Sequence, residues 1–184
     1  PTHLTIDEKQ KLIEEIKPEN NQTIYFSAIE YKNIYPLSET HHSYNSETEI
    51  LLVCGIANPD PLIEKLSSEF KKVYPLTFKD HHYFTYDDIE EVKEAFDHIT
   101  STNKMIITTE KDASRLMLLQ DKITAYQLPI YIQSIGIQFL YNEAESFNEE
   151  VISFIQSIIP PHSTDLDIED DPDIIFEEVV TLPL

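Results

Sequence analysis

The dipeptide Asp80–His81 has the residue types best suited to acid–base chemistry in this sequence. A carboxylate beside an imidazole can fix the tautomer of the ring and raise its basicity, as a general base requires. Neighbours in sequence need not touch in a loop. The alternative is therefore that His81 and His82 form local hydrogen bonds and lead into the next helix. Asp80–His81 is therefore a candidate catalytic pair, and the alternative is a purely structural role in the loop.

A second polar segment, Thr109-Glu110-Lys111-Asp112, lies where a predicted strand meets a predicted helix. Thr109 or Asp112 could cap that helix, and Glu110 would then lie near its positive end. In the functional interpretation, Thr109, Glu110 and Lys111 line a nucleotide or phosphate cleft. The residues alone leave both interpretations open.

No metal site is expected. His81–His82 and His41–His42 are adjacent pairs in separate segments, and adjacent histidines rarely chelate one ion unaided. Neither a cysteine pair nor a His-Glu-x-x-His helix supports zinc binding. A metal-dependent hydrolase using Asp80, His81 and His82 is therefore the weakest functional alternative. The single cysteine, Cys54, stands in an apolar run, which indicates a buried core residue and a reducing compartment.

The elements that would position these segments alternate along the chain. Apolar periodicity and capping patterns predict a helix from residue 6 to 16, strands at 23–29, 49–54, 72–77 and 105–109, helices at 60–70, 86–99 and 112–119, extended segments at 125–132 and 135–140, and a last helix capped by Ser146. Pro129 indicates an edge or an irregular segment. The alternation predicts an α/β fold with a mainly parallel sheet and helices on both faces. The polar segments after three successive strands should then converge on one edge of the sheet, where sites gather in such folds.

Composition excludes several partners. The net charge of −21 argues against nucleic acid and against direct electrostatic docking on anionic lipid. No apolar run is long enough to span a bilayer, so a soluble chain is expected. Residues 160–184 are acidic, contain prolines and lack Lys and Arg, which predicts a disordered tail. The start at Pro1 instead of a methionine indicates a trimmed chain or an internal fragment.

A phosphate-binding loop is missing from this sequence. Transfer of a phosphoryl group from ATP commonly uses the pattern G-x-x-x-x-G-K-[ST]. The only glycines are Gly55 and Gly136, so neither this pattern nor G-x-G-x-x-G occurs. The chain has no recognisable cradle for nucleotide phosphates.

An ordered set of short motifs nevertheless resembles the second half of lipid A 4′-kinases (tetraacyldisaccharide 4′-kinases). The set comprises Gly55-Ile56-x-x-Pro59, Asp80–His81, Thr109-Glu110-Lys111-Asp112-Ala113 and Leu128–Pro129. It covers about residues 50–135, and the paired histidines resemble the Bacteroidetes branch. The resemblance implies a P-loop-kinase-like fragment that lacks the phosphate loop.

The resemblance also implies a reaction and a site. In that family the γ-phosphate of ATP is transferred, with Mg²⁺, to the 4′-hydroxyl of the tetraacyldisaccharide 1-phosphate precursor of lipid A. By motif match His81, with Asp80, would help activate the sugar hydroxyl, and Thr109, Glu110 and Lys111 would lie at the cofactor cleft. This chain alone is expected to be inactive and to hold neither ATP nor Mg²⁺.

By the same comparison, residues 1–45 would be the end of the nucleotide domain, 49–127 a smaller α/β domain, and 130–159 a return to the nucleotide domain. The intact enzyme would act at the cytoplasmic face of the bacterial inner membrane, with membrane contact through the missing amino-terminal part. Exposed apolar faces, such as that of Ile6, Leu12 and Ile16, could drive dimerisation. The competing hypothesis is a stand-alone α/β interaction or regulatory module without chemistry.

Overall fold

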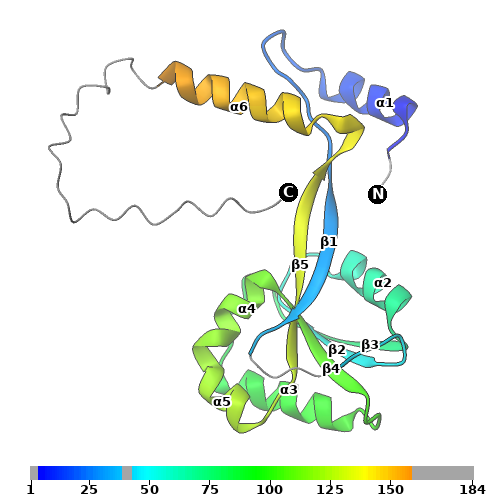
Figure 1. Cartoon of the computed structure of the whole chain (residues 1–184), viewed down its shortest axis with the longest axis vertical. Helices are drawn as coiled ribbons and strands as arrows, with labels where there is room; N and C mark the ends of the chain where they lie inside the picture. Colours follow the sequence, from blue (N-terminus) through cyan, green and yellow to red (C-terminus); the bar gives the residue numbers. More distant parts are fainter. Residues whose placement is uncertain (1–3, 39–42, 159–184) are drawn as a thin grey trace, which may run out of the picture. The chain divides into compact units, whose positions relative to one another are not determined.

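The computed structural model describes residues 4–38 and 43–158 (Figure 1). The described residues form two compact units, one of residues 4–17, 27–38 and 43–138, the other of residues 18–26 and 139–158. No helix in the described part is long and apolar enough to cross a membrane. The elements are α1 (Ile6–Ile16), β1 (Ser27–Pro36), β2 (Glu49–Cys54), α2 (Asp60–Glu69), β3 (Lys72–Thr77), α3 (Tyr86–His98), β4 (Lys104–Thr109), α4 (Glu110–Leu116), η1 (Met117–Leu119), α5 (Gln120–Ala125), β5 (Ile130–Phe139), η2 (Leu140–Asn142) and α6 (Ala144–Ile158).

The sheet is mostly parallel, which confirms the predicted α/β class. Its strand order is β1-β5-β4-β2-β3. The pairs β2–β3, β2–β4 and β4–β5 are parallel. Strand β1 runs antiparallel to β5. Leu37 N–H, after the end of β1, donates to the carbonyl of Ile130 at the start of β5, whereas the carbonyl of Lys32, within β1, accepts from the side chain of Gln133, further along β5. Figure 1 shows the two strands running side by side.

Two hydrophobic clusters cover the two faces of this sheet. Alternate residues of β2 point to opposite faces, so Leu51 and Val53 pack with α3, α4 and α5, whereas Ile50 and Leu52 pack with α2. Because both faces are covered, the central strands β2 and β4 are buried along almost their whole length. The sequence pattern of near-continuous apolar runs therefore identified these strands correctly, and helices do lie on both faces.

Helix starts follow the predicted local signals in two cases. Thr5 and Glu8 form a capping box at α1, and Thr85 and Asp88 form one at α3. Reciprocal bonds of this kind satisfy backbone N–H groups that would otherwise lack partners. Ser146, in contrast, does not cap the last helix. Helix α6 begins at Ala144, and the Ser146 hydroxyl lies 3.3 Å from the Tyr25 hydroxyl.

The long strands β1 and β5 differ from the prediction. Strand β1 covers Ser27–Pro36 instead of 23–29. The two extended segments predicted at 125–132 and 135–140 are one strand, β5, from Ile130 to Phe139, and Ala125 belongs to α5. Of the two alternatives expected at Pro129, the irregular segment is observed, because the strand begins only at Ile130, and the edge strand is not, because β5 lies between β1 and β4. Pro129 is accommodated because it precedes the strand, where its carbonyl accepts a hydrogen bond from Ile106 N–H. The predicted helix at 112–119 begins at Glu110 and passes into η1 and α5.

The second unit holds α6 and the segment before β1. Tyr25 contacts the rings of Phe139 and Phe147, and its hydroxyl donates to Glu150 at 2.7 Å. Several large apolar side chains of α6 are exposed: Val151, Ile152, Phe154, Ile155 and Ile158. The predicted disordered tail at 160–184 lies outside the described residues.

Candidate functional site

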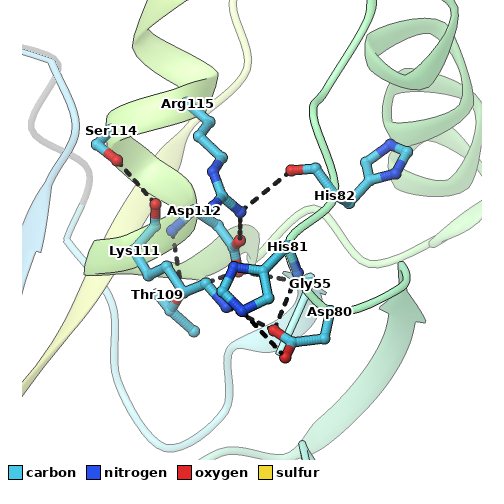
Figure 2. A network of polar contacts seen from close by, with 9 residues as sticks. All are labelled: Gly55, Asp80, His81, His82, Thr109, Lys111, Asp112, Ser114 and Arg115. Atoms are coloured by element: carbon cyan, nitrogen blue, oxygen red, sulfur yellow. Dashed lines mark hydrogen bonds and ion pairs between the residues drawn. The ribbon is translucent and has the colours of Figure 1, made fainter. Parts of the chain in front are cut away.

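The segments that follow the carboxyl ends of β2, β3 and β4 meet, as the strand pattern predicted (Figure 2). The backbone N–H of Gly55, after β2, donates to Asp112 Oδ2 at 2.8 Å. The ammonium group of Lys111, in the first turn of α4, donates to Asp80 Oδ1 at 2.5 Å. These two contacts tie the first turn of α4, which follows β4 directly, to the loops after β2 and β3. Asp80, His81 and Lys111 therefore lie at one edge of the sheet.

Asp80 lies between a cation and the candidate base. Its Oδ1 accepts from His81 N–H at 2.9 Å as well as from Lys111, and its Oδ2 lies 3.5 Å from His81 Nε2. The His81 side chain is 72% exposed, so a reactant in solution can reach the ring. Its backbone has φ of 62°, a left-handed conformation that is uncommon outside glycine and that occurs at functional sites when surrounding contacts enforce it.

The charge of Asp80 is stabilised by these neighbours. The hydrogen bond from Lys111 is the main cause that lowers the pKa of the Asp80 carboxyl, and the charge of His81 lowers it further, against a smaller opposing effect of burial. A carboxylate that stays ionised can orient an imidazolium and stabilise its charge. Asp80 is therefore suited to support proton acceptance by His81.

Removal of the lysine charge tests this arrangement. We expect Lys111→Met to raise the pKa of Asp80 towards its ordinary value, because the main stabilising hydrogen bond is lost. Since the folded-state pKa is lowered, the stability from this contact is present above the ordinary aspartate pKa and disappears as the pH falls through the lowered value. A carbon NMR titration of the Asp80 carboxyl measures the shift. Lys93→Met, which removes the partner of Asp97, should leave the Asp80 titration unchanged.

The adjacent His82 has a different environment. Its Nε2 lies 2.9 Å from Asp88 Oδ2, and its ring stacks on Phe78 at 4.8 Å between centroids. In Figure 2 the His82 ring points away from Asp80, whereas the His81 ring lies beside it. Burial raises the pKa of Asp88, but the hydrogen bonds from His82 and Thr85 outweigh it and leave that pKa lowered. The local structural role foreseen for both histidines therefore describes His82.

The Thr109–Asp112 segment also divides into separate roles. Thr109 caps α4, with its hydroxyl accepting from Asp112 N–H at 3.2 Å and donating to Asp112 Oδ2 at 2.8 Å. Glu110 points to the β1–β5 side, where its carboxylate accepts from the Ser134 hydroxyl at 3.0 Å, and from the Tyr35 hydroxyl and the Ile135 N–H at 3.3 Å each. The structure therefore brings Lys111, but not Thr109 or Glu110, into contact with Asp80.

Two further residues, which sequence reasoning did not assign to the site, support it. Asp112 has no exposed surface and binds both Gly55 and Thr109, and Arg115 Nη1 lies 3.8 Å from its Oδ1 and donates to the carbonyl of His82 at 3.2 Å. Together they connect α4 to the loop that carries Asp80–His81. The only sequence signal was the three-residue spacing of Thr109 and Asp112, which indicates a helix start and says nothing of the loops.

Metal ligation and thiol chemistry find little support in the described residues. Across residues 4–38 and 43–158, no group of three or more His, Cys, Asp or Glu side chains could hold a metal ion. Burial, helped by the negative charge of Asp112, raises the pKa of the Cys54 thiol to about 11. Since the thiolate is the reactive form, the buried Cys54 is a poor nucleophile at neutral pH, and it lies in the core, as its position predicted.

Comparison with known proteins identifies relatives of one kind. A tetraacyldisaccharide 4′-kinase of Bacteroides thetaiotaomicron is 35% identical over 150 residues, which are 73% of this chain and 39% of the relative. That of Parabacteroides distasonis is 36% identical over 147 residues (77% and 40%), and that of Flavobacterium johnsoniae 30% identical over 163 residues (88% and 44%). The chain thus spans about two fifths of the length of these relatives. No solved structure gives a significant match.

A family model described as tetraacyldisaccharide-1-P 4′-kinase matches residues 3–156, which include every strand of the sheet and all three segments of the site. This match extends over most of the chain, and it agrees with the motifs from which the resemblance was inferred. The chain therefore belongs to the tetraacyldisaccharide-1-P 4′-kinase family.

Proposed function

We propose that this chain is the carboxy-terminal part of a kinase that transfers the γ-phosphoryl group of ATP to the 4′-hydroxyl of the tetraacyldisaccharide 1-phosphate precursor of lipid A. Family membership supports the reaction, and the relatives carry the same name. The observation that carries the proposal is the contact of Asp80 with both Lys111 and His81 at an open sheet edge. In this proposal the site supplies a proton acceptor for the sugar hydroxyl.

The proposed step is an in-line displacement at the γ-phosphorus. The hydroxyl oxygen forms a bond to that phosphorus, the bond from the phosphorus to the bridging oxygen of ADP breaks, and the hydroxyl proton passes to His81. General-base assistance of this kind contributes about 10²–10⁴-fold to a rate. Asp80 orients the His81 ring and stabilises its positive charge, and Lys111 keeps Asp80 ionised. Asp80 and Lys111 are positioning residues here, and His81 is the catalytic residue.

The phosphate cradle does not fit this chain. Gly55 and Gly136 are its only glycines, and Gly55 is enclosed by the Lys79 carbonyl, His82 and Asp112 instead of facing an open loop. The residues for the triphosphate and for Mg²⁺ therefore belong, in this proposal, to a nucleotide domain outside these 184 residues. Residues 1–45 and 130–159 would be the parts of the chain that belong to that domain, with 49–127 as the smaller domain.

Transfer of radiolabel from [γ-³²P]ATP to tetraacyldisaccharide 1-phosphate tests the function. We expect a protein of the relatives' full length that contains this chain to label the 4′ position, and the 184-residue chain alone to give only background. No label with the longer protein would reject the kinase and favour a module without chemistry. Label with the short chain would show that it carries a phosphate site of its own.

The substrate also implies a place of action. A tetraacylated sugar resides in a membrane, so we propose that the kinase works at the cytoplasmic face of the inner membrane. The net charge of −21 opposes contact of this chain with anionic lipid, so the amino-terminal part would make that contact. Exposed apolar residues, including Ile6 and Ile16 of α1 and Phe154 of α6, would be covered there or by a second copy.

A further inference from the structure

Tyr83 follows His81 by two residues in the loop after β3, and its side chain is left in solvent. It is 77% exposed, whereas the next most exposed tyrosine, Tyr86, is 47% exposed. The residues on either side of Tyr83 face inwards, since the ring of His82 packs on that of Phe84, which belongs to the hydrophobic core. The loop that carries the candidate base therefore also presents one aromatic ring to solvent.

A fixed cation lies over one face of the Tyr83 ring. The guanidinium carbon of Arg115 is 5.3 Å from the ring centroid, within the range of cation–π attraction. The guanidinium is itself held, because Nη1 donates to the His82 carbonyl at 3.2 Å and lies 3.8 Å from the buried carboxylate of Asp112 (Figure 2). An exposed tyrosine alone is common, but a ring restrained in this way loses less side-chain entropy when a ligand packs on it.

The chemistry of the Tyr83 side chain suits a sugar. The face of an aromatic ring is negative, and a pyranose ring presents C–H hydrogens of small positive charge on each of its faces. The tyrosine hydroxyl can both donate and accept hydrogen bonds, as the hydroxyl groups of a sugar require. A neutral sugar ring is also not repelled by the net charge of −21. The ligand that fits this ring is therefore an uncharged pyranose.

The position of Tyr83 relates this ligand to the candidate base. Two residues of chain span at most about 7 Å, so Tyr83 and His81 have their α-carbons within that distance. Both side chains are exposed, His81 at 72%. A pyranose ring is wide enough to pack on one side chain and to present a hydroxyl group on its edge to the other.

We propose that the sugar ring of the acceptor stacks on Tyr83, with Arg115 holding the aromatic ring in place. This inference rests on the proposed function for the identity of the sugar. Tyr83 is then a specificity-determining residue, which favours a hydroxyl group carried by a pyranose ring over one carried by an alkyl chain. No bond to Tyr83 forms or breaks in the reaction, so the residue contributes to binding of the acceptor and not to the chemical step.

Saturation-transfer NMR of methyl β-glucopyranoside with the 184-residue chain tests the contact without ATP. The axial hydrogens of this sugar divide between its two faces, so stacking should transfer saturation from the aromatic protons to one set more strongly than to the other. Tyr83→Ala should abolish this difference. Tyr86→Ala is the matched control and should preserve it, because Tyr86 also has a cation near its ring, Lys122 at 5.4 Å, but its hydroxyl binds Asp121.

Kinetics of a protein of the relatives' full length that contains this chain provide the second test. Tyr83→Ala should raise the KM for tetraacyldisaccharide 1-phosphate by about tenfold and leave kcat and the KM for ATP unchanged, because stacking acts equally on the ground state and the transition state. Tyr83→Phe keeps the flat ring and should retain most of the affinity. Tyr83→Leu keeps an apolar side chain without the ring and should be as defective as Tyr83→Ala.

Three results would overturn the proposal. They are a Tyr83→Leu variant with the original KM, which would favour contact with an alkyl chain, equal saturation of the two faces of the sugar, and a difference between the faces that survives Tyr83→Ala. The saturation experiment involves no phosphoryl transfer, so its failure is distinguishable from failure of the proposed function. Radiolabel transfer without stacking would reject only the role of Tyr83, and stacking without radiolabel transfer would reject only the kinase.

Discussion

In the proposed full-length kinase, His81→Ala is expected to lower kcat by about 10²–10⁴-fold, the range in which a general base contributes. The His81 ring is exposed and lies beside Asp80, whose pKa is lowered chiefly by Lys111. Loss of the ring removes the proton acceptor and few packing contacts. The unfolding free energy should therefore change by no more than about 0.5 kcal/mol, as is usual at the surface. Steady-state kinetics and urea unfolding of the same preparation measure both effects.

Two comparison variants make this result specific. Asn tolerates the left-handed backbone of residue 81 better than most residues, so His81→Asn should keep the loop conformation and still lose activity. His82→Ala should instead lower the unfolding free energy by about 1–3 kcal/mol, because the contacts with Asp88 and Phe78 disappear. Full turnover in both variants at position 81 would reject His81 as the base, whatever the stability of the His82 variant.

The central strands and their helices could be predicted because their signals are local. Both faces of β2 and β4 are covered, so the strands are apolar throughout, and Thr85 with Asp88 marks the start of α3 within four residues. Each of these signals depends on the residue's own neighbours in the chain. The bounds of β2 and β3 accordingly agree with the prediction, and those of α2, α3 and β4 differ by one residue.

The β1–β5 pair could not be predicted in the same way, because its stabilisation is non-local. Strand β1 pairs with residues about a hundred positions later, and it has no buried residue in its ten. Without a strongly apolar face, its sequence does not define where pairing begins. Pro129 then suggested an edge, although the proline only precedes β5 and the strand lies inside the sheet.

The candidate site was predictable at the level of loops and not of contacts. Strand order alone brings the segments after β2, β3 and β4 together, since parallel strands place their carboxyl ends at one edge. Which side chains meet depends on loop conformation. The bond from Lys111 to Asp80 joins residues 31 positions apart, so no local sequence pattern contains it. The left-handed backbone at His81 likewise has no signal in the neighbouring residues. The roles of His81 and the cofactor residues remain predictions.

A substitution of Asp112 should destabilise the carboxyl-end edge of the sheet more than any other substitution considered. Its side chain is wholly buried, Oδ2 accepts from Gly55 N–H and the Thr109 hydroxyl, and Arg115 lies 3.8 Å from Oδ1. Oδ1 itself has no hydrogen bond among the described residues, so the carboxylate depends on Arg115 for compensation. A buried carboxylate in this position joins the end of β2 to the start of α4.

Asp112→Ala is therefore expected to lower the unfolding free energy by about 3 kcal/mol. The Gly55 N–H and the Thr109 hydroxyl would lose their acceptor inside the protein, and Arg115 would lose its counter-charge. Asp112→Asn keeps one acceptor oxygen and should lose less. Urea unfolding measures the change, with Asp97→Ala as a control, since that exposed partner of Lys93 should contribute little to stability.

The same variants separate a general loss of stability from a loss of loop position. Arg115 also donates to the His82 carbonyl, and the Gly55 loop lies against Lys79 and His82, so Asp112→Asn should shift the amide NMR signals of Asp80 and His81 even where the chain stays folded. Asp112 would be dispensable if the Asp112→Asn variant had unchanged amide signals and unfolded at the same urea midpoint as the Asp97→Ala control. The expected result would instead make Asp112 the buried group that holds the histidine loop against α4, because no other described side chain binds both Gly55 and Thr109.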